Sequence, residues 1–109
     1  MTEELLEMLE QAAIDKCIEL DLSEQGLTEV PPAVFQLSHL QWLSLDDNQL
    51  TVLPPDIAKL FQLKQLELND NQLLTLPPQI AQLSQLEALY VSDNQLAMLT
   101  PDIAKLSQL

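Results

Sequence analysis

The stretch LQWLSLDDNQLTVLPPDIAKLFQ, residues 40–62, recurs twice more in almost the same form. Residues 63–85 read LKQLELNDNQLLTLPPQIAQLSQ, and residues 86–108 read LEALYVSDNQLAMLTPDIAKLSQ, so each copy starts 23 residues after the last. One period upstream, residues 17–39 read CIELDLSEQGLTEVPPAVFQLSH, a more divergent copy. A fixed period of this size is typical of stacked repeats, in which each unit buries its apolar face against its neighbours.

The first half of each copy predicts a short β-strand. In residues 40–46 the apolar and polar side chains alternate, so we expect Leu43 and Leu45 to point inward and Trp42, Ser44 and Asp46 to point outward. Because each strand follows the last after one full circuit of the chain, the strands of successive copies are expected to run parallel.

The second half of each copy predicts a short helical turn. Ile57 and Leu60 lie three residues apart, and Pro55 precedes them at a position where a helix tolerates proline, since the first N–H groups of a helix have no partner. Ile80 and Leu83 follow the same pattern after Pro77-Pro78, as do Ile103 and Leu106 after Pro101.

Residues 2–16 predict an amphipathic helix ahead of the repeats. Leu5, Leu6, Leu9, Ala12 and Ala13 share one helical face, and Thr2 is placed to cap the amino end. We expect this helix to cover the open edge of the first repeat. The predicted organisation is a capping helix at 1–16 and a repeat domain at 17–109, with repeats at 17–39, 40–62, 63–85 and 86–108.

Asparagines recur at one position of the turn that leaves each strand. Asn48, Asn71 and Asn94 each carry a donor and an acceptor, so we expect them to bond the backbone of their own turn and of the adjacent turn. Gln25 takes this place in the first copy, followed by Gly26, which predicts a looser turn there.

These residues resemble the leucine-rich repeat signature, L-x-x-L-x-L-x-x-N-x-L. The length of 23 residues and the LPPxI segment are similar to the intracellular class found in bacterial, Ras-suppressor-like and Roco-protein repeat domains. The resemblance implies an α/β repeat solenoid, a right-handed superhelix with a parallel concave sheet. It also implies a non-enzymatic module that binds proteins on that face.

The charge of the chain restricts its partners. Seventeen acidic residues against four basic ones give a formal net charge of −13. Such a field repels nucleic acid and anionic membranes and attracts a basic protein or peptide. The acidic start of the chain does not resemble a leader peptide, and the single cysteine, Cys17, excludes an intramolecular disulfide. We therefore expect a cytoplasmic protein.

The outward strand positions form columns across the repeats, and one column is entirely acidic. Trp42 and Tyr90 supply the aromatic side chains that are enriched where interfaces bind most tightly. The predicted partner-binding residues are Trp42, Ser44, Asp46, Asp47, Gln65, Glu67, Asn69, Asp70, Tyr90 and Asp93. Two other interpretations of the acidic column stay open. Its acids could lie at a solvated turn and only keep the protein surface soluble, or Asp47, Asp70 and Asp93 could bind calcium.

Apart from the calcium interpretation, nothing in the sequence predicts catalysis, a metal site or a cofactor. Cys17 takes a core leucine position, and His39 has no second zinc ligand nearby. A Roco GTPase needs a glycine-rich phosphate loop, whereas this sequence has one glycine.

A structural function is the alternative prediction. The last repeat has no covering unit in this sequence, so the chain could pair with a second copy as a homodimer, or be a piece of a larger Roco-like signalling protein. The predicted self-association edge consists of Leu86, Leu89, Val91, Leu96, Leu99, Ile103, Leu106 and Leu109.

Overall fold

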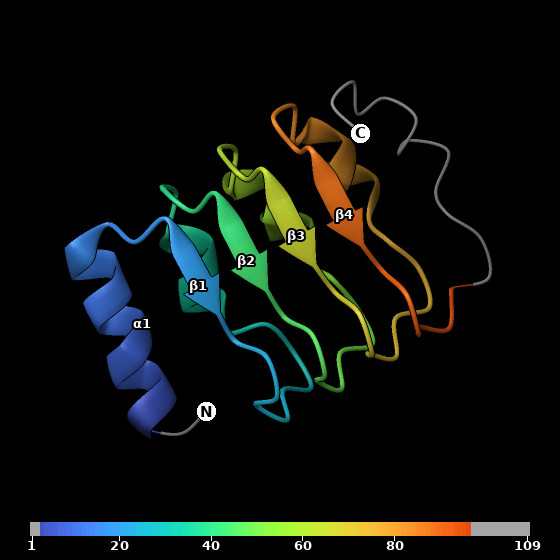
Figure 1. The fold of residues 1–109 in the computed structure, drawn as a ribbon, viewed down its shortest axis with the longest axis horizontal. Coiled ribbons are helices and arrows are strands. Elements are labelled where there is room, and N and C mark those ends of the chain that lie inside the picture. The colour runs from blue at the N-terminus through green and yellow to red at the C-terminus, as the bar shows by residue number, and fades with distance from the viewer. Residues whose placement is uncertain (1–2, 97–109) are drawn as a thin grey trace.

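A computed structural model of the chain describes residues 3–96. One α-helix is followed by strands that alternate with short 3₁₀-helices (Figure 1). In chain order the elements are α1 (Glu3–Asp15), β1 (Glu19–Asp21), η1 (Pro32–Gln36), β2 (Trp42–Ser44), η2 (Pro55–Lys59), β3 (Gln65–Glu67), η3 (Pro78–Gln82) and β4 (Ala88–Tyr90).

The strands form one parallel sheet in the order β1-β2-β3-β4. The register matches the sequence repeat, because Trp42 pairs with Glu19 on one side and with Gln65 on the other. Each strand therefore lies beside the same segment of the next repeat. As the sequence predicts, the strands are parallel and every crossover is one repeat long.

The 3₁₀-helices form the opposite layer and begin at the prolines. Pro32, Pro55 and Pro78 occupy the first helical positions of η1, η2 and η3, where a missing N–H costs nothing. The predicted helical turns thus occur in three copies, and the Pro101 copy lies outside the described residues.

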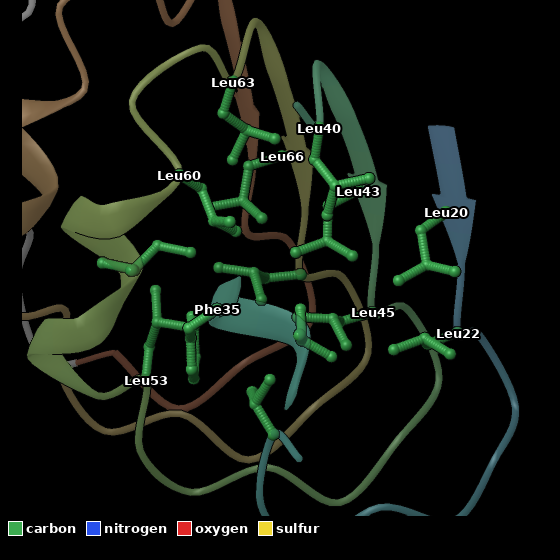
Figure 2. Packing of buried hydrophobic residues seen from close by; sticks show 14 of the residues in the cluster. Leu20, Leu22, Phe35, Leu40, Leu43, Leu45, Leu53, Leu60, Leu63 and Leu66 are labelled. Atoms are coloured by element: carbon green, nitrogen blue, oxygen red, sulfur yellow. The ribbon is translucent and has the colours of Figure 1, made fainter. Parts of the chain in front are cut away.

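The core lies between these two layers and is almost entirely aliphatic (Figure 2). Leu43 and Leu45 of the second repeat point inward and are fully buried, as are Ile57 and Leu60 from the opposite layer. Cys17 packs against the core but is only half-buried.

Helix α1 lies at the β1 end of the solenoid and contacts η1 (Figure 1). Leu5, Leu9 and Ala12 are buried, whereas Leu6 is 41% exposed and Ala13 is also exposed. The predicted apolar face was therefore too wide, because a helix at the end of a stack meets neighbours on one narrow stripe. Thr2, the predicted cap, lies outside the described residues. Across residues 3–96, no helix combines the length and apolar character needed to span a bilayer.

Candidate functional site

The outer face of the sheet carries two columns of side chains in strand register. One column contains Glu19, Trp42, Gln65 and Ala88, and the other contains Asp21, Ser44, Glu67 and Tyr90. This face points away from the 3₁₀-helices (Figure 1). Tyr90 is 47% exposed on β4, and Trp42 is half-buried on β2. The two aromatic side chains thus lie on one surface, two strands apart.

A hollow of about 330 Å³ opens beside Trp42 at the amino ends of the strands. Its lining combines apolar, amide and charged groups, from Ile18, Glu19, Gln41, Trp42, Lys64 and Gln65. Ile18 is 49% exposed, so it and the Trp42 indole offer apolar surface to a partner. The hollow is suited to receive one side chain of a bound protein.

The sequence analysis missed three residues of this hollow. Ile18, Gln41 and Lys64 precede β1, β2 and β3 at equivalent positions, each one repeat from the next. The outward columns could not have found them, because Gln41 and Lys64 have the same parity as the inward Leu43 and Leu66 along the predicted strands. They lie just before the strands, where the alternation of inward and outward side chains ends.

Ser44 is predicted to contact a partner, but the structure buries it. Its side chain is 4% exposed, although it points to the outer face. In the sheet register Ser44 lies between Asp21 and Glu67, whose longer side chains flank it. It therefore offers almost no surface for recognition.

Asp46 and Asn69, both predicted to bind a partner, each form hydrogen bonds with the next repeat. Asp46 Oδ1 accepts from the Asn69 backbone N–H at 2.7 Å. Asn69 Oδ1 in turn accepts from the N–H and the hydroxyl of Ser92, each at 2.8 Å. We call this the forward ladder, because each side chain reaches one repeat ahead.

Partial burial changes the pKa of the Asp46 carboxyl. Loss of hydration raises the pKa of Asp46, and this outweighs the hydrogen bond from Asn69 that lowers it. The nearby Glu67 carboxylate raises the Asp46 pKa further. At Asp21, by contrast, hydrogen bonds from the Ser23 hydroxyl and N–H lower the pKa of the carboxyl.

The all-acidic column has a backbone explanation. Glu24, Asp47, Asp70 and Asp93 have φ values of 57°, 56°, 57° and 55°, in the left-handed region. Among residues other than glycine, aspartate and asparagine adopt this region most readily, because their short polar side chains bond the local backbone. The turn therefore favours an aspartate or an asparagine at this position whatever the protein binds.

These carboxylates are nevertheless exposed and close to one another. The Asp47 N–H donates to the Asn69 carbonyl and the Asp70 N–H to the Ser92 carbonyl, so the turns stay in contact beyond the strands. Loss of hydration raises the pKa of Asp70, and the Asp93 and Asp47 carboxylates raise it further. We call Asp47, Asp70 and Asp93 the acidic rim.

The asparagines form a second ladder that runs in the opposite direction. Asn71 Nδ2 donates to the Leu68 and Asn69 carbonyls of its own turn, at 3.2 and 3.1 Å. It also donates to the Leu45 carbonyl at 3.0 Å, and its Oδ1 accepts from the Leu50 N–H at 3.1 Å. We call this the backward ladder, because it reaches the preceding repeat.

The other two asparagines repeat the pattern. Asn48 bonds the Leu22 carbonyl and the Gln25 and Leu27 N–H groups, and Asn94 bonds the Leu68 carbonyl and the Leu73 N–H. Gln25 itself is exposed, and Gly26 adds a second left-handed residue at φ 67°. The first turn therefore differs from the other three in having no asparagine at this position and a second left-handed residue.

The predicted self-association edge is only partly within the described residues. Leu86 is fully buried, whereas Leu89, Val91 and Leu96 are half-buried. Leu99, Ile103, Leu106 and Leu109 lie outside the described residues. Within residues 3–96, β4 pairs with a strand on one side only.

The described part of the chain shows no arrangement of three or more His, Cys, Asp or Glu side chains that could hold a metal ion. Cys17 is free, and its thiol donates to the Glu19 carbonyl. His39 lines a small pocket of about 50 Å³ near Cys17.

The family profile described as "Leucine rich repeat" matches residues 18–73 and 38–96, together more than half of the chain. The chain belongs to the leucine-rich repeat family. Among curated proteins, no match to this leucine-rich repeat chain was found.

Solved structures share the fold. A leucine-rich repeat protein of Leptospira interrogans is 32% identical with a TM-score of 0.67, over 99% of this chain and 33% of that chain. The leucine-rich repeat domain of the type III effector XopL is 31% identical with a TM-score of 0.80, over 91% of this chain and 34% of that chain. The plant peptide hormone receptor RGFR1, solved in complex with RGF2, is 32% identical with a TM-score of 0.67, over 84% of this chain and 17% of that chain.

The leucine-rich repeat chain thus spans about a third or less of these three proteins. The fold is an α/β repeat solenoid with a parallel concave sheet and an N-terminal helix, as the sequence predicts. The narrower class, of 23 residues with LPPxI, stays a prediction.

Proposed function

We propose that the chain is a non-enzymatic module that binds a basic protein or peptide on its concave strand face. The observation that carries this proposal is the acidic rim, whose exposed carboxylates follow the carboxyl ends of the strands that carry Trp42 and Tyr90. The family membership and the similarity to a receptor solved with its ligand support it.

Repulsion within the rim provides a reason to bind cations. Neighbouring strands of a sheet lie about 4.8 Å apart, so the carboxylates of Asp47, Asp70 and Asp93 repel one another. The raised pKa of Asp70 reflects this repulsion after its loss of hydration. A lysine or arginine of a partner placed over the rim relieves it, and the net charge of −13 accelerates the encounter.

Trp42 provides the test, since it is the only tryptophan of the chain. Titration with a lysine-rich peptide is expected to change its fluorescence, and added salt is expected to weaken binding. An acidic peptide of equal length is expected to have no effect.

The variant Asp47→Asn/Asp70→Asn removes two rim charges while keeping a residue type that tolerates the left-handed backbone. The matched control, Glu7→Gln/Glu10→Gln, removes two exposed charges from α1. We expect weaker binding only in the rim variant. Equal losses of affinity in both variants would show that binding depends on net charge alone, and the proposed site would be wrong.

A second candidate function is assembly through the last repeat, as a homodimer. Leu89 and Val91 are half-buried, whereas their equivalents Leu66 and Leu68 are fully buried. Pairing with a second copy would cover this apolar surface. Light scattering over about a hundredfold dilution tests this, because a dimer dissociates by mass action. A monomer at every concentration would exclude the assembly function.

We also propose a cytoplasmic location. Cys17 is a free thiol packed against the core, which suits a reducing compartment. Fractionation of cells that express the tagged chain tests this location, and recovery in a secreted fraction would contradict it.

A further inference from the structure

Lys64 brings a positive charge into a strongly acidic face. It lines the hollow beside Trp42, together with Glu19 and two glutamines. Among the lysines of residues 3–96, Lys59 forms an ion pair with Asp56 at 3.4 Å. Lys64 has no ion-pair partner within the described residues.

The strand face is therefore polarised along its strands. The hollow lies at the amino ends, where the charges of Lys64 and Glu19 sum to zero. The acidic rim follows the carboxyl ends, where the turn begins. From Trp42 to Asp47 the chain advances five residues, which is at most about 16.5 Å at about 3.3 Å per residue, since β2 ends at Ser44.

We infer that the hollow accepts an uncharged apolar side chain, and that Lys64 determines specificity by excluding basic side chains from it. This inference rests on the proposed function and deepens it. The ligand is an extended segment with an aliphatic or aromatic residue in the hollow and a basic residue about five positions away, over the rim.

The exclusion follows from the lining of the hollow. Ile18 and Trp42 offer apolar contact to an incoming side chain, whereas a lysine placed there would lie close to the Lys64 ammonium group. Like charges about 6 Å apart at a protein surface change an affinity by about threefold to tenfold. Without Lys64 the hollow keeps the Glu19 carboxylate and becomes attractive to a basic side chain.

Two peptides of identical composition test the inference. In FSGSKK the lysines lie four and five residues from the phenylalanine, and in KFKSGS they flank it; both are acetylated and amidated. Trp42 fluorescence measures both affinities. We expect the wild type to prefer FSGSKK by about threefold to tenfold.

The variants separate the role of Lys64 from that of net charge. Lys64→Gln is expected to lower the ratio of the two affinities, because only the attraction of the acidic rim for the lysines of FSGSKK remains, and Glu19→Gln is expected to keep or increase it. The matched control Lys59→Gln, which removes a lysine from η2, should leave the ratio unchanged. A ratio near one in the wild type, or the same ratio in Lys64→Gln, overturns this inference but not the proposed function. No binding of either peptide overturns both.

Discussion

Replacement of Asn71 by alanine should destabilise the fold more than any exposed substitution in the same turn. Asn71 is 7% exposed and bonds four backbone groups, two of which belong to the preceding repeat. Alanine leaves the buried Leu50 N–H without this partner, whereas the Leu45 carbonyl keeps the hydrogen bond from Asn48 Nδ2 at 3.0 Å. A buried group left unpaired costs about 1–3 kcal/mol and the loss of a further hydrogen bond about 1 kcal/mol, so we expect the free energy of unfolding to fall by about 2–4 kcal/mol.

Urea denaturation followed by Trp42 fluorescence measures this loss. For a chain of this size, 1 kcal/mol corresponds to about 4 °C, so the melting temperature should fall by about 8–16 °C. The matched control is Gln72→Ala, at the exposed neighbouring position, where a change within about 0.5 kcal/mol is expected.

Asn71→Asp provides a second check on the same bonds. It keeps an acceptor for the Leu50 N–H but loses the donor, and it places a carboxylate against the Leu45 and Leu68 carbonyls. We expect it to be at least as destabilising as alanine. If Asn71→Ala and Gln72→Ala unfold at the same urea concentration, the backward ladder does not hold the turns together.

Three other substitutions test separate parts of the fold. Leu9→Ala, on the buried stripe of α1, should lower the free energy of unfolding by about 2–4 kcal/mol, whereas Leu6→Ala on the exposed flank should change it by less than about 1 kcal/mol in the same denaturation. Asp47→Val should cost about 1–2 kcal/mol because φ is 56°, and Asp47→Gly should not; calorimetry that ranks them equally would contradict the backbone explanation. Asp46→Asn keeps an acceptor for the Asn69 N–H but no charge. Since the folded-state pKa of Asp46 is raised, its ionisation destabilises the fold, and the stability of the wild type recovers as pH falls through that pKa. The variant should therefore melt at the same or a higher temperature at about pH 7, and lose this advantage at about pH 3.

The repeat pattern was enough to predict the fold, because apolar spacing reports burial directly. Leu43, Leu45 and Ile57 are buried where the periods of two and three residues place them. The helix was predicted less well. Leu6 and Ala13 belong to the apolar face of α1, but the sequence does not show that only one narrow stripe of that face meets a neighbour.

The binding site was harder to predict than the fold, because the type of a residue does not reveal its backbone conformation. The acidic column suggested a binding surface, whereas the left-handed φ of Asp47 is already a reason for aspartate there. Asp46 and Asn69 point outward but are committed to the next turn. The burial of Ser44 depends on the length of its neighbours, and Lys64 precedes β3 at a position that strand alternation assigns to the inward side.

The two ladders also restrict how such a chain changes length. The backward ladder joins residues 21, 23 or 26 positions apart, and the forward ladder joins residues 23 positions apart. A duplication or deletion of one central repeat, 40–62 or 63–85, keeps both ladders continuous, because Asn48 and Asn71 occupy equivalent positions, as do Asp46 and Asn69. Loss or gain of a single residue within a strand or the turn that follows it displaces the donors and acceptors of both ladders. We therefore expect the array to tolerate the gain or loss of a central repeat better than the gain or loss of a single residue in these segments.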